Sequence, residues 1–450
     1  MREGRKPMNI LIIGGGGREH AVAAALARSP RVDKIWCAPG NGGIAAIAEC
    51  VPIKATDLDG VLQFCLQNRP DLVVVTPDDP LALGMVDLLE EHGIAAFGPR
   101  KNAAIIEGSK SFAKDLMARY DIPTAACRVF DDMDAALAYV SDCPVPIVVK
   151  ADGLALGKGV FICETRAEAA DAVRAVMGER LFGDAGARVV IEEFLTGPEV
   201  SVLCFTDGAT IVPMPAAQDH KRAFAGDRGP NTGGMGAFTP VSCYTPAVAR
   251  QCMESIFMPT VRAMKAEGRE FRGVLYFSLM LTGDGPKVIE YNCRFGDPET
   301  QAVLPLLRSD LLEIMLAVRA GHLCDVPVEF DDRACCCVVM ASQGYPGSYP
   351  KGLPIFGIGA AEKAGCAVYH AGTERKDGAL VTSGGRVLGV SAVADTLKGA
   401  VDLAYRGVSH IAFYGAFYRQ DIARKDPAVH RSVSAEAPAA AAPKARIDWS

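Results

Sequence analysis

Residues 8–108 alternate four apolar runs with helix-like stretches, and this alternation sets the strongest limit on how the chain can fold. The apolar runs are NILIIGG, KIWCAP, DLVVVTP and AAFGP, and helices are expected at 19–29, 57–68 and 80–92. This pattern is typical of an open parallel sheet, and runs that are apolar throughout indicate strands covered on both faces. We therefore predict an α/β domain at 8–108, with residues 1–7 as an N-terminal extension.

From residue 109 the pattern changes, and it predicts two further domains and a tail. Residues 109–330 carry helices expected at 109–119, 133–141, 166–178, 246–267 and 308–319 between apolar strands, with a subdomain at 124–195. Residues 331–425 are predicted to form a small, strand-rich α+β domain. Residues 426–450 include the tract APAAAAPKA, whose composition cannot build a core, so we predict a disordered tail there.

Composition excludes several classes of protein. The net charge of −6 and the lack of a long basic run argue against a nucleic-acid partner. No uncharged apolar run reaches the roughly 18 residues of a transmembrane helix, so no membrane partner is expected. The 15 cysteines have no paired spacing, which indicates a reducing compartment rather than a disulfide framework. We therefore expect a cytoplasmic protein.

A strand-like run, VIEYN, leads into CRFGDPETQ and places Glu290 two residues before Asn292. Side chains at i and i+2 of a strand point to the same face, and Arg294 follows on that face with Asp297 just beyond. A carboxylate and an amide oxygen suit Mg²⁺, which usually takes one or two protein ligands and leaves its other positions to phosphates and water. For Glu290 and Asn292 alone, a solvated strand end with a salt bridge is an open alternative.

A glycine-rich stretch, KADGLALGKGV, follows the apolar run PIVVK. Its glycines allow the backbone to fold over an anion, and Lys150 and Lys158 supply positive charge. The spacing from Gly153 to Gly157 is one residue too short for a phosphate-binding loop of the GxxxxGK[ST] type, and no helix follows. We predict a flexible flap between two strands, and a hairpin with exposed lysines is the alternative.

The first apolar run ends in GGGGREH, at the start of an expected helix. A dinucleotide fingerprint fails here, because its third glycine would fall on Glu19 and the second strand ends in APGN without an acidic residue. A helix N-terminus with free amides still suits an anion or a ribosyl group.

Taken together, these motifs resemble the ATP-grasp ligases, and RFGDPETQ, PNTGGMG, GREHA and APGN resemble the phosphoribosylamine–glycine ligase family. The resemblance covers 8–425. It implies that 109–330 is an ATP-grasp domain pair that clamps a nucleotide, beside the N-terminal open parallel-sheet domain and the small C-terminal domain.

The resemblance also implies roles for individual residues. The nucleotide would contact Lys110, Lys150, Gly157, Lys158, Gly159, Glu192, Glu193, Leu195 and Glu199, with Glu199 at the ribose hydroxyls and adenine read near Glu193 and Leu195. Mg²⁺ or Mn²⁺ would bind Glu290 and Asn292, and the catalytic residues would be Arg294, Asp297 and Lys158. The second substrate would contact Gly17, Arg18, Glu19, Asn41, Asp78, Asp219, Lys221, Asn231, Thr232, Gly233 and Arg386.

The implied reaction joins glycine to 5-phosphoribosylamine with ATP, through a glycyl phosphate, in purine biosynthesis. The chain is expected to act as a monomer. Two alternatives stay open, which are another ATP-grasp ligase or carboxylase and a non-catalytic nucleotide-binding descendant. The chain departs from the family at Asp78, where a glutamate is usual, at Leu156, and at Phe277 and Ser278 in the strand before the metal motif, where added volume is expected beside the nucleotide.

Overall fold

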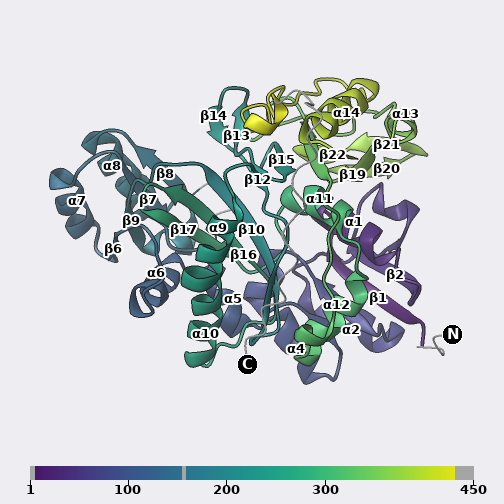
Figure 1. Ribbon diagram of the computed structural model, residues 1–450, viewed down its shortest axis with the longest axis horizontal. Coiled ribbons are helices and arrows are strands. Elements are labelled where there is room, and N and C mark those ends of the chain that lie inside the picture. The colour runs from purple at the N-terminus through teal and green to yellow at the C-terminus, as the bar shows by residue number, and fades with distance from the viewer. Residues whose placement is uncertain (1–5, 155–158, 431–450) are drawn as a thin grey trace.

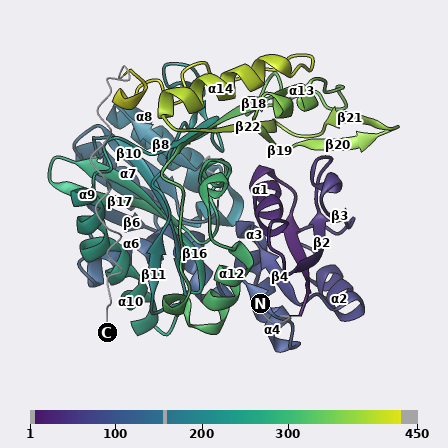
Figure 2. The same cartoon turned by 45° about the vertical axis from the view of Figure 1, so that its right-hand side comes forward.

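The computed structural model describes residues 6–154 and 159–430, and it begins with a five-stranded sheet in the order β3-β2-β1-β4-β5. The strands are β1 (Met8–Gly14), β2 (Val32–Pro39), β3 (Glu49–Cys50), β4 (Leu72–Val75) and β5 (Ala96–Phe97). Every neighbouring pair is parallel, which confirms the predicted open parallel sheet. Figure 2 shows this sheet beneath the C-terminal part of the chain.

Helices cover both faces of this sheet because β1 is apolar on both sides. Ile10 and Ile12 share a buried cluster with α1 and α12 (Leu311–Ala320), whereas Leu11 and Ile13 share one with α2 and α4. The helices of this region are α1 (Gly17–Leu26), η1 (Ile44–Ala46), α2 (Leu58–Asn68), α3 (Asp78–Leu83), α4 (Met85–Glu91) and α5 (Lys101–Gly108). The single helix predicted at 80–92 is divided, since Gly84 takes a φ of 94°, a left-handed conformation that ends α3.

A second sheet, in the order β6-β9-β7-β8, stands apart from the rest of the molecule (Figure 1, left). The chain leads to it through α6 (Lys110–Arg119), which packs against α5 and β17. Its own elements are β6 (Cys127–Phe130), α7 (Met133–Asp142), β7 (Ile147–Ala151), β8 (Val160–Cys163), α8 (Arg166–Val173), η2 (Arg174–Gly178), η3 (Gly183–Ala187) and β9 (Val189–Glu193). Strands β7 and β8 pair antiparallel, so the glycine-rich stretch connects two strands as predicted. Its residues 155–158 lie outside the described part of the chain.

The central sheet, in the order β11-β10-β16-β17, separates a polar face from an apolar one. It contains β10 (Glu199–Thr206), β11 (Ile211–Pro213), β16 (Gly273–Thr282) and β17 (Gly285–Asn292), and it packs on α9 (Pro246–Cys252), η4 (Met253–Phe257) and α10 (Met258–Ala266). Phe277 faces the apolar side, where its ring centroid is 4.4 Å from that of Phe257. The volume that Phe277 adds is therefore in the core and not beside the nucleotide, and only Ser278 faces the polar side.

The third large sheet, in the order β12-β15-β18-β22-β19, combines strands from two of the predicted domains. Its strands are β12 (Gln218–Asp219), β15 (Gly236–Thr239), β18 (Ala334–Ala341), β19 (Ala367–His370) and β22 (Arg386–Ala394). Around it lie α11 (Glu299–Val303), η5 (Leu304–Leu306), α13 (Ile358–Lys363) and α14 (Leu397–His410), with the hairpins β13 (Arg222–Phe224)–β14 (Arg228–Asn231) and β20 (Thr373–Lys376)–β21 (Ala379–Thr382). Helix α12 (Leu311–Ala320) packs instead beside β5 and β16, with η6 (Leu323–Asp325) against it. The C-terminal strands thus continue a sheet that begins in the middle of the chain.

The ordered chain extends past residue 425, where the tail was predicted to begin. Asp426 is buried, begins the short helix η7 (Pro427–Val429), and accepts hydrogen bonds from the backbone and hydroxyl of Ser242. Residues 426–430 were predicted to belong to a disordered tail, and that prediction is wrong. The polar contact that holds them cannot be inferred from composition. Residues 1–5 and 431–450 lie outside the described part. No helix within 6–154 and 159–430 is long and apolar enough to cross a membrane.

Arg419 links the β13–β14 hairpin to the C-terminal segment through hydrogen bonds and ion pairs. Its fully buried guanidinium donates to Asp421 at 2.7 and 2.8 Å and to the carbonyl oxygen of Arg222 at 3.1 Å, and it pairs with Asp227 at 2.8 Å. We expect Arg419→Met to lower the free energy of unfolding by about 2–3 kcal/mol, because both aspartates lose their guanidinium partner, although Asp227 keeps Lys425 and Asp421 keeps the amide of Gly226.

Thermal unfolding of Arg419→Met and of Arg424→Met tests this expectation. Arg424 is exposed and lies over the Tyr405 ring at 5.3 Å, so its loss should matter far less. Equal melting temperatures for the two variants would contradict the role of Arg419.

Candidate active site

Most of the predicted site residues line one cavity of about 760 Å³ between the central sheet, the separate β6–β9 sheet and the C-terminal strands. These residues are Arg18, Asp78, Lys110, Lys150, Gly159, Glu192, Glu193, Leu195, Glu199, Asp219, Lys221, Asn231, Thr232, Gly233, Glu290, Asn292, Arg294, Asp297 and Arg386. Gly157 and Lys158 fall outside the described residues. Elements that are far apart in the sequence therefore bring the predicted residues together.

Glu290 lies at the centre of a group of cations. Burial acts to raise the pKa of its carboxyl, but Lys221, Lys150, Lys110 and Arg294 outweigh burial and hold that pKa below its usual value. The carboxylate therefore stays charged, and it has no hydrogen-bond donor among the described residues. Three of these cations also pair with other carboxylates, Lys150 with Glu192, Lys221 with Glu199 and Arg294 with Glu107. Their ammonium and guanidinium groups still gather at one place in the cavity, which suits the oxygens of a polyanion.

Asn292 stands beside Glu290 on the same face of β17, because the strand alternates its side chains. Its Oδ1 atom accepts a hydrogen bond from Arg294 at 3.1 Å. The described residues contain no group of three or more His, Cys, Asp or Glu side chains that could hold a metal ion. One carboxylate and one amide oxygen fit a hard cation whose other positions are taken by phosphates and water.

The other end of the cavity combines apolar walls with a buried ion triad. Glu192, which is 3% exposed, pairs through Oε2 with Lys150 at 3.0 Å and with Lys114 at 3.1 Å. Its Oε1 atom is buried without a hydrogen-bond partner in the described part of the chain. The surrounding walls are Met117, Ala125, Val148, Leu195, Met280 and Ile289. Glu192 therefore keeps one acceptor without a donor close to these apolar side chains.

Asp297 is held through both of its oxygens. Oδ1 accepts from the amide of Gln301 at 2.7 Å, and Oδ2 pairs with Arg386 at 3.2 Å. Burial acts to raise the pKa of Asp297, but Arg386 and Arg18 outweigh it and the pKa lies below the usual value. Arg386 also donates to the carbonyl oxygens of Asp297 at 2.8 Å and Gly233 at 2.7 Å, so it joins the 229–236 loop to the metal motif.

Asp78 lies at the start of α3, near the carboxylate of Glu107 and the guanidinium of Arg294. Glu107 pairs with Arg294 at 3.2 Å and accepts from the backbone of Cys293 at 2.7 Å. The strand end that carries Arg294 is thus fixed by the N-terminal region.

A second cavity of about 360 Å³ adjoins the first and shares Asp297, Tyr345 and Arg386 with it. Its other walls are Gly15, Gly16, Gly40, Asn41, Ala371, Gly372, Thr373, Ser383 and Gly384. Asn41 uses its whole amide to order these loops, since Nδ2 donates to Gly15 and His370 and Oδ1 accepts from the amides of Gly43 and Ile44.

Two predicted residues, Gly17 and Glu19, do not line either cavity. Glu19 is 2% exposed and accepts from the amide of Gly16 at 2.6 Å and from Arg18 at 2.6 Å. A side chain at Gly17 would meet Nε2 of Gln301 at 2.5 Å, so this glycine permits a close approach of α1 to α11. Both residues shape the turn that carries Arg18.

Sequence reasoning missed several residues of the site. Lys114, Glu107, Gln218, Tyr276, Glu299 and Gln301 take part in the cavity or its hydrogen bonds. Glu107 and Lys114 flank Lys110, and Glu299 and Gln301 end the GDPETQ motif. Tyr276 had no motif signal, and only its hydrogen bonds to Ser201 at 2.7 Å and Glu299 at 3.0 Å identify it.

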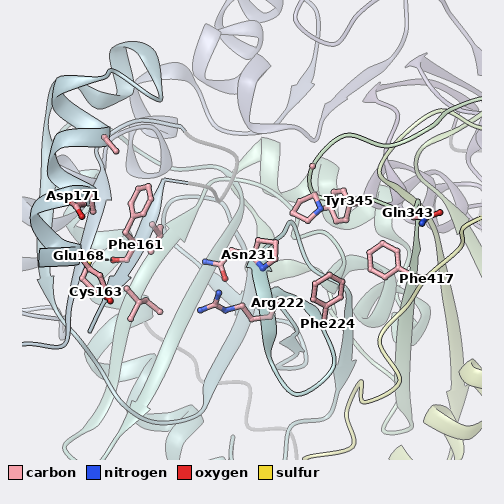
Figure 3. Close-up of a pocket in the computed structure, with 18 of the residues that line it drawn as sticks. Phe161, Cys163, Glu168, Asp171, Arg222, Phe224, Asn231, Gln343, Tyr345 and Phe417 are labelled. Atoms are coloured by element: carbon pink, nitrogen blue, oxygen red, sulfur yellow. Dashed lines mark hydrogen bonds between the residues drawn. The ribbon is translucent and has the colours of Figure 1, made fainter. Parts of the chain in front are cut away.

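Another cavity, of about 1380 Å³, opens between the β8–α8 face and the β13–β14 hairpin (Figure 3). Phe161, Phe224 and Phe417 form much of its apolar lining, and Arg222 and Asn231 lie between them. Asn231 also lines the 760 Å³ cavity, so the two cavities adjoin.

Sequence patterns of one family match consecutive parts of the chain. The phosphoribosylglycinamide synthetase N domain matches residues 8–107, the ATP-grasp (A) domain matches 108–300 and the C domain matches 335–425. A phosphoribosylamine–glycine ligase of Caldanaerobacter subterraneus subsp. tengcongensis is 48% identical over 416 residues, which cover 92% of this chain and 99% of that protein. The Homo sapiens trifunctional purine biosynthetic protein adenosine-3 is 47% identical over 417 residues, or 92% of this chain and 41% of that protein.

A comparison with solved structures finds the same kind of protein. The phosphoribosylamine–glycine ligase of Thermotoga maritima has a TM-score of 0.81 and 34% identity, covering 92% of this chain and 100% of that chain. Biotin carboxylase of Campylobacter jejuni has a TM-score of 0.70, covers 91% of this chain and 93% of that chain, and at 14% identity shares the fold alone.

Proposed function

The chain belongs to the phosphoribosylglycinamide synthetase family, and from that premise we infer that it joins glycine to 5-phosphoribosylamine with ATP in purine biosynthesis. The products are glycinamide ribonucleotide, ADP and phosphate. Near-half identity over almost the full length of such ligases confirms the family predicted from the sequence and does not favour a carboxylase or a non-catalytic descendant.

The observation that carries the nucleotide assignment is the unsatisfied Oε1 of Glu192 between apolar walls. A purine fills a flat apolar slot, and the exocyclic amine of adenine can donate to a buried acceptor, whereas a guanine carbonyl cannot. Glu199 lies farther along the same cavity, where it would meet the ribose hydroxyls. Glu193 and Leu195 would contact the base with their backbone, as the resemblance implies.

The phosphates would lie against the cations around Glu290. Lys110 and Lys150 reach the cavity from α6 and β7, and Gly159 follows the glycine-rich stretch. We propose Mg²⁺ or Mn²⁺ at Glu290 and Asn292, where such an ion would neutralise phosphate charge and orient the phosphoryl group for transfer. Arg294 would stabilise the negative charge that develops during that transfer.

The smaller cavity would hold the phosphoribosyl group. Backbone amides at the start of α1 suit an anion, and Arg18 and Arg386 add positive charge. Asp78, Asp219, Lys221, Asn231, Thr232 and Gly233 would complete the walls around the sugar and the amino acid, with Asp297 towards the reacting amine. Gly17, Glu19 and Asn41 would act by shaping the loops.

The site would act by holding glycyl phosphate next to the amine of phosphoribosylamine. Fixing two reactants in an attacking geometry can lower the barrier by roughly 7–11 kcal/mol. The acyl phosphate reacts readily with water, so an enclosed cavity would also protect it. The proposed domain division follows these roles, with substrate at 8–108, nucleotide at 109–330 and a supporting C-terminal domain from 331.

We also propose a monomer in a reducing cytoplasm. The thiols of Cys204, Cys335 and Cys336 are buried outside any disulfide, as expected where thiols are kept reduced.

The direct test is ADP release with freshly formed phosphoribosylamine, glycine and ATP. We expect turnover only when all three are present, and glycinamide ribonucleotide should appear in equal amount to ADP. Turnover with bicarbonate or formate in place of glycine would support another ATP-grasp reaction. Nucleotide binding without turnover under every substrate combination would support the non-catalytic alternative.

A further inference from the structure

Ser278 occupies a central place on the polar face of the central sheet. It is fully buried on β16, directly opposite Ser201 of β10 on one side and Glu290 of β17 on the other. Its hydroxyl donates to Oε1 of Glu199 at 2.9 Å. Because a hydroxyl has one proton, this bond commits the donor of Ser278 to Glu199.

Hydrogen bonds hold one carboxylate oxygen of Glu199, Oε1, and leave the other, Oε2, to face the cavity. Lys221 donates to the same Oε1 atom, and Gln218 holds the backbone carbonyl of Glu199 at 2.9 Å. Its Oε2 atom has no hydrogen-bond donor among the described residues, and the residue lines the cavity. The two donors therefore fix the carboxylate plane and present Oε2 to whatever occupies the middle of the cavity.

We propose that Ser278 is a positioning residue that orients Glu199 to accept hydrogen bonds from the ribose of the nucleotide. This inference rests on the proposed nucleotide site, but it does not depend on which acid or amine is ligated. Lys221 alone would orient the carboxylate of Glu199 poorly, since its ammonium is a mobile point charge on a flexible stem. The hydroxyl of Ser278 comes from a rigid strand, and it restricts the rotation of the carboxylate.

The test measures the affinities of ADP and 2′,3′-dideoxy-ADP by calorimetry with Mg²⁺ and without other substrates. In Ser278→Ala, the Kd of ADP should rise about tenfold, the size of one hydrogen bond to a charged group, while that of the dideoxy nucleotide stays unchanged. The preference for the ribose hydroxyls should therefore shrink by the same factor. A merely structural role would weaken both nucleotides equally, and that result would overturn the proposal, as would no change in either.

Two further variants sharpen the test. Thr206→Val removes a buried hydroxyl from the far end of β10, where Thr206 donates to the carbonyl of Thr210 at 2.7 Å, and it should leave the ADP preference intact. In a Glu199→Ala background, Ser278→Ala should have no further effect on ADP affinity, because the residue that it orients is gone. Additive losses would mean that Ser278 acts by another route.

A failure of the proposed role of Ser278 can be distinguished from a failure of the proposed ligation reaction. A parent protein that prefers ADP over the dideoxy nucleotide but never ligates glycine would contradict the proposed reaction and leave this inference standing. A parent protein without that preference would refute the role of Ser278 even if ligation is normal.

Discussion

Glu290→Gln and Asn292→Ala are each expected to lower kcat for ligation by about 10²–10³-fold, the usual cost of losing one preorganised group that stabilises transition-state charge. Both side chains lie on one face of β17 and offer the oxygen atoms that fit a hard cation. Melting temperatures should change little, because neither side chain belongs to the apolar core. ADP release at saturating Mg²⁺ measures the effect.

Asp284→Asn is the matched control for these variants. Asp284 is an exposed carboxylate at the turn of the same β16–β17 hairpin, so its replacement should leave kcat unchanged. Turnover close to that of the parent protein in either Glu290→Gln or Asn292→Ala would remove the metal assignment.

Glu192→Gln is expected to have the largest effect on stability. Glu192 is the counter-charge for Lys114 and Lys150, whose side chains are 3% and 4% exposed. Without it both buried ammonium groups lose their direct ion pair and Lys150 keeps only the field of Glu290, and breaking such a buried pair typically costs about 3–5 kcal/mol. Nucleotide affinity should fall as well, because the unsatisfied Oε1 acceptor is altered. Thermal unfolding and calorimetric titration with ADP report the two effects separately.

Two companion variants make this prediction specific. Glu179→Gln changes an exposed carboxylate in the same part of the chain and should have almost no effect. Adding Lys114→Met to Glu192→Gln removes one of the two unpaired charges, so part of the lost stability should return. A double variant that is less stable than Glu192→Gln would show that Lys114 contributes through packing instead.

Local patterns predicted much of the site because their geometry needs only a few consecutive residues. Glu290 and Asn292 share a face because every strand alternates its side chains, and the glycine-rich stretch joins two strands because apolar runs flank it on both sides. The same rule explains the error at Phe277. Phe277 and Ser278 are neighbours on β16, so only one of them could face the nucleotide, and the strand pattern alone did not show which.

Non-local partners account for what the sequence did not predict. Lys114 joins the site only because the fold places it beside Glu192 on another strand, and no motif includes that pair. Asp426 is ordered because Ser242, far away in the chain, donates to it. Asn41 and Glu19 were predicted to contact the substrate. In the structure their polar side-chain groups form hydrogen bonds with the backbone of neighbouring loops.

The amino-acid sequence by itself determined the parallel N-terminal sheet, the strand that carries Glu290 and Asn292, and the family to which the chain belongs. Hydrophobic periodicity and short motifs encode these features within a few residues of one another. The tertiary structure alone decided that β12 and β15 complete the C-terminal sheet, and that Arg386 meets Asp297. Those pairings join segments far apart in the sequence, and they form only because burial of apolar faces brings complementary polar groups within hydrogen-bond distance.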